Sequence, residues 1–294
     1  MNINIFGRKL RYAIMKPEIV KQEVIYAYRS LRWRWEGHKF SKHWYEKARE
    51  CKWIFLLGCN NSGTTLVYNV LGLHPAISAL PRDGQKLTKA LPNSDSLHYP
   101  RIWTERLDVL RLTEGDNRCD RARLVYDWID YKKEVSTEFI LVKSPPDTIR
   151  SRWLQEVFGH CYFIGLVRNG YVVCEGIRRR NRYSMERCAR HWNLANKVML
   201  EDSQFLDHFK LLTYEELTHD PIAALGSLAD FLGLEQSEFR SIAERKFVVH
   251  NIDGMRSQIR NFNARSLSRL SPEDNMTITL HAREMLERFG YLPT

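Results

Sequence analysis

The segment WIFLLGCNNSGTTLVYNVLGLHP, residues 53–75, decides the fold of this chain. An apolar run ends at Gly58, a polar turn follows, and apolar residues then recur at helical spacing from Thr64. A turn that joins a buried strand to the start of a helix gathers backbone N–H groups and the positive end of the helix dipole at one point. The segment therefore predicts an anion-binding loop at the carboxyl end of a strand.

The side chains of this loop suit a phosphate or sulfate group. Gly63 lets the backbone approach a ligand closely, and Ser62, Thr64 and Thr65 add hydroxyl donors. The spacing from Gly58 to Gly63 matches most of a Walker A loop, but Thr64 stands where that loop has its lysine. Phosphoryl transfer normally needs this lysine and a magnesium-binding acid. A P-loop kinase or hydrolase is therefore an alternative function, as is a non-catalytic anion-binding module.

Short apolar runs of strand length recur along the chain, at 52–58, 138–143, 161–167 and 209–213. Such runs face apolar surroundings on both sides, which is typical of a parallel sheet covered by helices. We predict helices over 64–73, 120–133, 146–158, 171–182 and 184–204. The fold class is therefore α/β, a three-layer P-loop-like domain with a central parallel sheet over residues 51–294. Two later runs end at Lys143 and Arg168, where a magnesium site would have an acid.

Residues 1–50 form a separate, basic unit. They hold 12 Lys and Arg against 5 Asp and Glu, whereas the remaining residues hold 33 against 30. Aromatic residues among basic ones at helical spacing predict a helical extension in which Trp33, Trp35 and Trp44 pack against the body. Weak contact with a membrane surface is the alternative role of this extension. The nearly neutral body argues against a nucleic-acid partner.

The sequence gives no sign of export or of membrane insertion. No run approaches the roughly 18 apolar residues of a membrane helix, and basic residues from Arg8 to Arg11 interrupt any signal-peptide core. We expect a soluble, cytoplasmic protein whose six cysteines are reduced and structural. Oligomeric state is not predicted.

Residues 51–294 resemble the sulfotransferases that use 3′-phosphoadenosine 5′-phosphosulfate (PAPS), most closely their tyrosylprotein-type and carbohydrate-type branches. The motifs that carry the resemblance occur in order: GCNNSGTT with LGLHP, LVKSPPDTIR, FIGLVRNGYVVCEGIRRR, LLTYEELTHDPIAALGSLADFLGL and REMLERFGYLP. The resemblance implies transfer of a sulfuryl group from PAPS to a hydroxyl or amine of a sugar, peptide or small-metabolite acceptor. It implies no metal, and adenosine 3′,5′-bisphosphate (PAP) as a product.

The resemblance also implies a donor site, which maps onto Asn61, Ser62, Gly63, Thr64, Thr65, Arg168, Gly176 and Tyr214. The loop residues would hold the 5′-phosphosulfate, Arg168 would clamp the 3′-phosphate, and Tyr214 would border the adenosine. Family members usually have a basic residue at position 61 and a serine at position 176. Asn61 can donate a hydrogen bond to the leaving phosphate but cannot neutralise it. The arginines that could replace the missing serine are Arg178, Arg179, Arg180 and Arg182.

The catalytic candidates are Lys143 and Asp83. Lys143 matches a lysine that some relatives place on the transferring group, where a cation stabilises charge on the leaving oxygen. Asp83, in the loop after the first predicted helix, is the first choice for the general base, with His98 and His250 in reserve. Asp-Gly is also an ordinary turn signature, so a structural role for Asp83 stays open. His74 is expected to be a structural cap.

Two loops complete the predicted site. The irregular stretch 80–103 and the helix 120–133 are expected to form the acceptor pocket, where Arg101, Arg106 and Arg111 could suit an anionic acceptor. Residues 250–266 fall where the family's C-terminal loop covers the nucleotide. The candidate phosphate ligands there are Arg256, Arg260 and Arg265.

Overall fold

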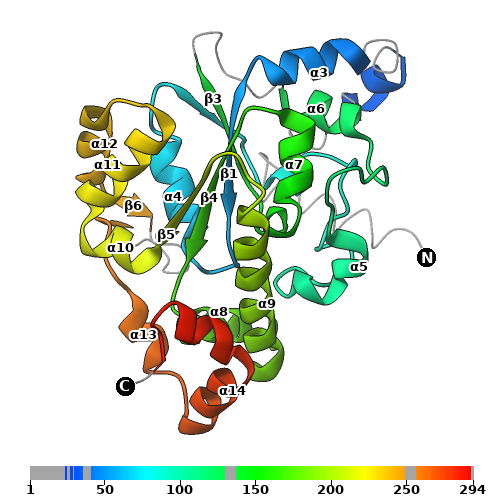
Figure 1. Ribbon diagram of the computed structural model, residues 1–294. Helices are drawn as coiled ribbons and strands as arrows, with labels where there is room; N and C mark the ends of the chain where they lie inside the picture. The colour runs from blue at the N-terminus through cyan, green and yellow to red at the C-terminus, as the bar shows by residue number, and fades with distance from the viewer. Residues whose placement is uncertain are drawn as a thin grey trace, which may run out of the picture.

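The computed structural model describes residues 41–129, 137–248 and 256–292, together with 24, 27, 28 and 30–35. Its main sheet has five parallel strands in the order β2-β3-β1-β4-β5 (Figure 1). The strands are β1 (Lys52–Leu57), β2 (Ile77–Ala79), β3 (Phe139–Lys143), β4 (Cys161–Val167) and β5 (Phe209–Thr213). The chain runs from β1 to one side of the sheet and returns to the other side through β4. Ligands of such sheets bind at this reversal, outside the carboxyl ends of the strands.

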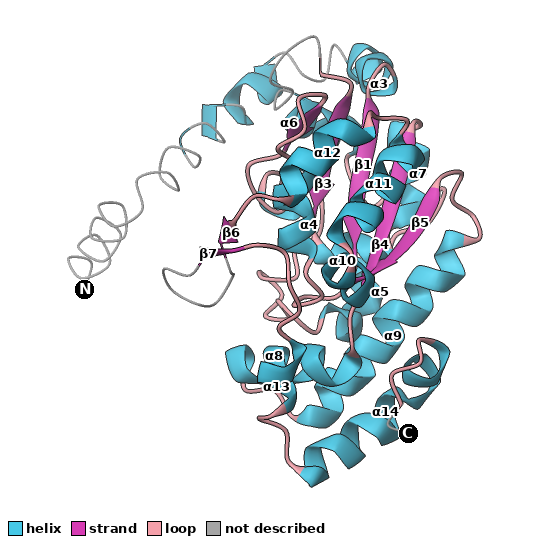
Figure 2. Ribbon diagram, turned by 90° about the vertical axis from the view of Figure 1, so that its left-hand side faces the viewer, coloured by secondary structure: helices cyan, strands magenta, loops and turns pink. Residues whose placement is uncertain are grey.

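Helices surround the sheet. They are α3 (Ser41–Arg49), α4 (Thr64–Leu71), α5 (Leu107–Leu110), α6 (Arg121–Ile129), α7 (Ser151–Phe158), α8 (Gly170–Asn181), α9 (Met185–Ser203), α10 (Tyr214–His219), α11 (Pro221–Leu232), α12 (Gln236–Ala243), α13 (Asn263–Leu267) and α14 (Pro272–Arg288). Short 3-10 helices are η2 (Gly84–Lys86), η3 (Trp103–Arg106) and η4 (Pro145–Ile149), and a small antiparallel pair is formed by β6 (Phe247–Val248) and β7 (Arg256–Ser257). Helices α8, α13 and α14 lie beyond the carboxyl ends of the strands (Figures 1 and 2).

The sheet is the middle one of three layers. Alternate residues of β1 enter two cores, Trp53 and Phe55 on one face and Ile54 and Leu56 on the other. Helices α6, α7, α8, α9 and α14 contribute to the first core, and α4, α11 and α12 to the second. Full burial of a side chain such as Ile54 stabilises the fold by about 1.5–3 kcal/mol. The predicted three-layer α/β architecture is confirmed.

Most predicted elements match observed ones, but strand β2 was not among them and one predicted helix is divided in the structure. The short strand β2 was not predicted, because three residues give too little periodicity to separate a strand from a loop. The helix predicted over 146–158 is split into η4 and α7. Two prolines begin η4, and the backbone leaves helical geometry at Arg150 (φ −141°). Helix 120–133 is observed as α6, and residues 130–133 lie outside the described part.

The described part of the N-terminal extension is helical over 30–35 and in α3. Trp33 is buried, and Trp44 packs edge-on against Tyr126 with ring centroids 5.0 Å apart. Trp35, however, is 81% exposed, so the prediction that it packs against the body is wrong. Positions two apart on a helix point to different faces, and Trp33 takes the inward one. Within the described residues, no helix has the length and apolar character needed to cross a bilayer.

Much of residues 1–50 lies outside the described part, so the membrane-surface role and the boundary at residue 50 stay predictions. All six cysteines are free, and five of them are buried. Burial raises the pKa of the Cys188 thiol to about 12, which keeps it protonated at neutral pH. This agrees with their expected role as small apolar residues.

Candidate functional site

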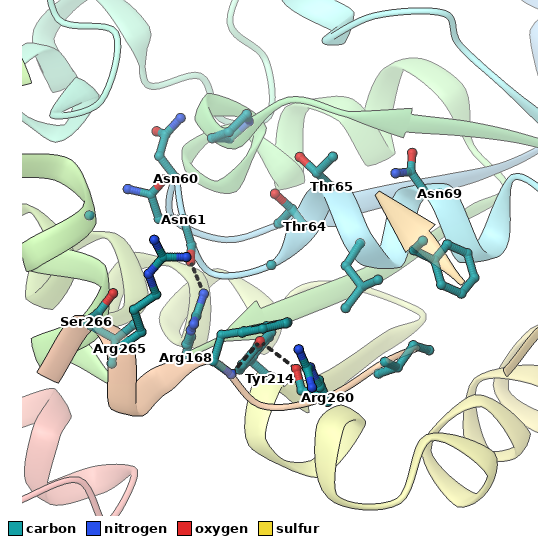
Figure 3. Close-up of a pocket in the computed structure, with 18 of the residues that line it drawn as sticks. Asn60, Asn61, Thr64, Thr65, Asn69, Arg168, Tyr214, Arg260, Arg265 and Ser266 are labelled. Carbon is teal, nitrogen blue, oxygen red and sulfur yellow. Dashed lines mark hydrogen bonds between the residues drawn. The ribbon is translucent and has the colours of Figure 1, made fainter. Parts of the chain in front are cut away.

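A cavity of about 440 Å³ opens at the carboxyl ends of the parallel strands (Figure 3). Its wall combines the loop after β1, the end of β3, the residue that follows β4 and the start of α10. The segment 257–269 closes the opposite side. The residues predicted for the donor site, together with the two first-choice catalytic residues, all line this cavity except Ser62: Asn61, Gly63, Thr64, Thr65, Asp83, Lys143, Arg168, Gly176 and Tyr214. Because parallel strands end at one edge, motifs far apart in sequence meet there.

The conformation of the loop from Gly58 to Thr64 depends on a hydrogen bond to η4 and on a glycine within the loop. The backbone N–H of Gly58 donates to Thr148 Oγ1 at 2.7 Å, so η4 supports the loop. Gly63 has φ 100°, and a Cβ at this position would lie 2.8 Å from the ring of Tyr214. A glycine is therefore required both by the backbone and by the close packing.

Two polar atoms of the loop are buried without a hydrogen-bond partner in the structure, Ser62 Oγ and Asn61 Nδ2. Ser62 is fully buried and lies behind the cavity wall, so its predicted contact with a ligand stays a prediction. Unsatisfied buried donors are rare in folded proteins. Their concentration in this loop fits a site that donates hydrogen bonds to an anionic ligand.

Arg168 is fixed on three sides, and Figure 3 shows its bond to Asn61 and its position beside Tyr214. Its Nη1 donates to the carbonyl oxygen of Asn61 at 3.1 Å, and its Nε donates to Asn263 Oδ1 at 2.8 Å. The guanidinium lies 3.9 Å from the centre of the Tyr214 ring. Burial lowers the pKa of Arg168, and no ion pair of this residue is recorded within the described residues. A rigid, desolvated cation therefore borders the cavity next to the phosphate loop.

Lys143 and Asp83 meet although 60 positions separate them. Lys143 Nζ donates to Asp83 Oδ1, and their side chains are 16% and 22% exposed. Lys86 Nζ lies 3.6 Å from the other Asp83 oxygen. Two ammonium groups thus hold this carboxylate at the cavity wall, where it can accept a proton from a ligand.

Tyr214 is oriented by the C-terminal segment. Its hydroxyl donates to the carbonyl oxygen of Arg260 at 3.1 Å and accepts from the N–H of Phe262 at 3.3 Å. Phe247 and Ile259 add apolar surface to the cavity wall. An aromatic ring and apolar side chains in one cavity can bury a flat aromatic group such as a purine.

The structure separates the remaining candidates. Arg260 and Arg265 line the cavity, whereas Arg256 is exposed and lies outside its wall. His98 is exposed and outside the cavity, and His250 lies outside the described residues. His74 Nδ1 accepts from the N–H of Ala76 at 3.1 Å, as expected of a structural cap.

Of the arginines of α8, one lines the cavity and another pairs with a residue of α14. Arg179 lines the cavity and pairs with Glu175 at 2.9 Å, whereas Arg178 pairs with Asp274 on α14. A Cβ at Gly176 would lie 2.8 Å from Asn61 Nδ2. The two departures from the family pattern therefore fit each other, since Gly176 leaves room for the Asn61 side chain.

Sequence reasoning missed Asn263 and the direct contact of Arg101 with the phosphate loop. Arg101 Nη1 donates to Asn61 Oδ1 at 3.2 Å. Asn263 accepts from Arg168 and donates to Glu215 Oε1 at 2.6 Å, which gives Glu215 a structural role. The residue types alone carry no signal for these contacts, because they depend on how two irregular segments fold over the strand ends.

The fold and cavity define an α/β protein whose loop after β1 and basic cavity wall suit an anionic ligand. A model described as the sulfotransferase family matches residues 54–238. The chain belongs to this family, which confirms the class of enzyme predicted from the motifs.

Similar proteins carry related names. Protein-tyrosine sulfotransferase 2 of Gallus gallus is 25% identical over 277 residues, covering 85% of this chain and 72% of the relative. Protein-tyrosine sulfotransferase A of Caenorhabditis elegans is 22% identical, with 83% and 68% covered. A sulfotransferase structure from Alicyclobacillus acidocaldarius is 14% identical with a TM-score of 0.48, covering 80% of this chain and 92% of that one. A mouse sulfotransferase complexed with PAP is 13% identical with a TM-score of 0.44, covering 82% and 88%.

Proposed function

We propose that this sulfotransferase uses PAPS as its donor and the phenolic hydroxyl of a peptide tyrosine as its acceptor. The main evidence for PAPS as the sulfuryl donor is the hydrogen bond from Arg168 to the backbone of Asn61. This bond places a rigid guanidinium beside a loop rich in hydroxyl and N–H groups. One cavity thus has two separate binding positions for phosphate groups, as a 3′,5′-substituted nucleotide requires.

The charges around the cavity support the same donor. Its described wall contains one carboxylate, Asp83, and seven basic residues: Arg101, Lys143, Arg168, Arg179, Arg260, Arg265 and Arg269. A concave site with this surplus concentrates anions and binds a polyanionic nucleotide without a metal to neutralise it. The aromatic ring of Tyr214 and its apolar neighbours suit the adenine.

The site residues have different roles in sulfuryl transfer. When PAPS is bound, the acceptor oxygen bonds to sulfur, the bond from sulfur to the bridging oxygen breaks, and its electron pair stays on the 5′-phosphate. Asp83 takes the proton of the acceptor hydroxyl. Lys143, at the end of β3, holds that carboxylate in place and offers positive charge to the reacting oxygens. Thr64 and Thr65 donate hydrogen bonds from the loop.

A calorimetric titration with PAP tests the donor. We expect binding with the same affinity in magnesium and in excess EDTA, because the cavity wall supplies the positive charge. A P-loop kinase or hydrolase would instead bind ATP more tightly than PAP and would need magnesium. Tighter binding of ATP than of PAP, or a requirement for magnesium, would contradict the PAPS proposal.

A separate assay tests the acceptor, which the names of the protein-tyrosine sulfotransferase relatives suggest. Radiolabelled PAPS is incubated with a tyrosine peptide, with the same peptide carrying phenylalanine, and with an oligosaccharide. We expect label only on the tyrosine peptide. Label on the oligosaccharide alone would reject the tyrosine acceptor and leave the donor standing.

A further inference from the structure

The phosphate loop has no positive side chain of its own. Residues 58–65, GCNNSGTT, include no Lys, Arg or His. Asn61 adopts a left-handed backbone conformation (φ 70°), which asparagine tolerates better than most residues. Backbone N–H groups can hold an anion there, but sulfuryl transfer adds a further negative charge to the departing phosphate. Another element has to supply a cation at this end of the cavity.

Arg101 brings a guanidinium to the loop from a segment 40 positions away. Its Nη1 bonds to the Asn61 side chain, and both residues line the cavity. Burial lowers the pKa of Arg101, and Arg180 lowers it further. In the part of the chain that the structure describes, no carboxylate lies within ion-pair distance of Arg101. A partly desolvated guanidinium without a carboxylate partner gains most from an anionic ligand.

The neighbours of Arg101 fix its direction. Trp103 is fully buried, and its Nε1 donates to Asn60 Oδ1 at 3.1 Å. Ile102 between them is fully buried as well. Two successive asparagines of the phosphate loop are therefore bonded to two side chains of the 101–103 segment. These contacts fix the backbone from which the Arg101 side chain extends toward the loop.

The Asn61 side chain lies between Arg101 and Gly176. Because a guanidinium only donates hydrogen bonds, the Asn61 oxygen faces Arg101 and the amide nitrogen faces Gly176. Any side chain at position 176 would meet that nitrogen at 2.8 Å. The neutral residue at position 61, the glycine at 176 and the arginine at 101 thus form one fitted set.

We propose that Arg101 is the cation of the phosphate loop, presented through Asn61, and that it stabilises the negative charge which the 5′-phosphate gains during sulfuryl transfer. This role rests on PAPS as the donor. It differs from the role expected from the sequence, in which Arg101 would face an anionic acceptor. In the structure Arg101 bonds to the loop that holds the donor.

Arg101→Gln is the decisive variant, since glutamine keeps an amide donor for Asn61 and removes the charge. We expect kcat to fall by about 10²-fold or more, as for the loss of one preorganised donor at a reacting oxygen. The Kd of PAP, measured by calorimetry, should rise about tenfold. Arg101→Lys retains a charge and should bind PAP more tightly than Arg101→Gln. The matched control is Arg190→Gln, which removes a surface arginine paired with Glu186 outside the cavity and should change neither value.

Three results would overturn this role. Arg101→Gln with the kcat and the PAP affinity of the unaltered enzyme would show that the charge is not used. A raised KM for the acceptor with unchanged PAP affinity would place Arg101 in the acceptor site. Failure of the unaltered enzyme to bind PAP would remove the PAPS proposal itself, whereas the first two results leave it intact.

Discussion

Arg168 makes contacts that a lysine cannot reproduce. Its guanidinium donates in two directions, to Asn61 and to Asn263, and covers the ring of Tyr214. An ammonium group keeps the charge but loses the planar fork and the stacking. Hydrogen bonds to charged groups contribute about 1.5–3 kcal/mol each. We therefore expect Arg168→Lys to weaken PAP binding by at least tenfold in a calorimetric titration.

The matched control for Arg168→Lys is Arg190→Lys on α9. Arg190 pairs with Glu186 on the surface, and its side chain is 64% exposed. Surface pairs contribute about 0–1 kcal/mol, so this variant should bind PAP as the unaltered enzyme does. Equal PAP affinities of Arg168→Lys and the control would show that the geometry of the guanidinium is irrelevant.

Asp83 and Lys143 should affect turnover more than donor binding. Asp83→Asn removes the proposed general base, and the expected loss in kcat is about 10²- to 10⁴-fold with little change in the Kd of PAP. Lys143→Ala should also lower kcat. Because the two side chains are in contact, the double variant should lose less than the product of the single losses.

Asp95→Asn controls for charge in the same loop, since Asp95 pairs with Lys86 at 2.9 Å and lies outside the cavity wall. Its turnover should match that of the unaltered enzyme. Normal turnover of Asp83→Asn would instead assign Asp83 to the structural turn that an Asp-Gly pair often forms.

At the scale of elements, the sequence predicted what periodicity and strand length encode. The run 161–167 is β4 and the run 209–213 is β5, with the same bounds. The meeting of the motifs at the strand ends could also be predicted, because parallel topology brings those ends to one edge of the sheet. The hydrogen bonds of Arg101 to Asn61 and of Arg168 to Asn263 could not be predicted. They join residues that lie 40 and 95 positions apart in the sequence, and no sequence pattern reports such a contact.

His191 makes the junction of α9 and η3 sensitive to acid. Its Nδ1 lies 2.8 Å from Thr104 Oγ1, and its ring meets Trp103 edge-on at 4.6 Å. Burial lowers the pKa of His191 from 6.5 to about 3. Between these values the unfolded chain binds a proton that the folded chain does not. Stability from this group is therefore complete above about pH 6.5 and is lost as the pH falls, by about 1.4 kcal/mol per pH unit.

We expect His191→Gln to flatten this pH dependence. Between pH 7 and 5 the unaltered enzyme should lose about 2 kcal/mol more unfolding free energy than the variant, as measured by urea unfolding with tryptophan fluorescence. His219→Gln, which changes an exposed histidine, should keep the original dependence. Identical dependence in His191→Gln and the unaltered enzyme would show that this histidine is not the acid-sensitive group.

At the scale of the whole molecule, the C-terminal end of the described chain supports the anion site. Tyr291 donates to Glu215 Oε2 at 2.7 Å, and the other oxygen of Glu215 accepts from the side chain of Asn263 at 2.6 Å and from the N–H of Asn169 at 3.2 Å. Asn263 in turn accepts from Arg168. The residues after α14, the start of α10, α13 and the cap of α8 thus meet around one guanidinium. Donor affinity should therefore depend on a hydroxyl that does not line the cavity.

Tyr291→Phe tests this dependence, because it removes one hydroxyl and keeps the ring. It leaves an oxygen of Glu215 without its partner, which costs about 1–3 kcal/mol. For a chain of this size the unfolding midpoint should fall by about 2–4 °C per kcal/mol. We also expect a severalfold weaker affinity for PAP, measured by calorimetry. The control is Tyr162→Phe on β4, whose ring stacks on His208 at 4.7 Å and lies outside the cavity wall. Lower stability of Tyr291→Phe with unchanged PAP affinity would show that the C-terminal contacts support the fold without positioning Arg168.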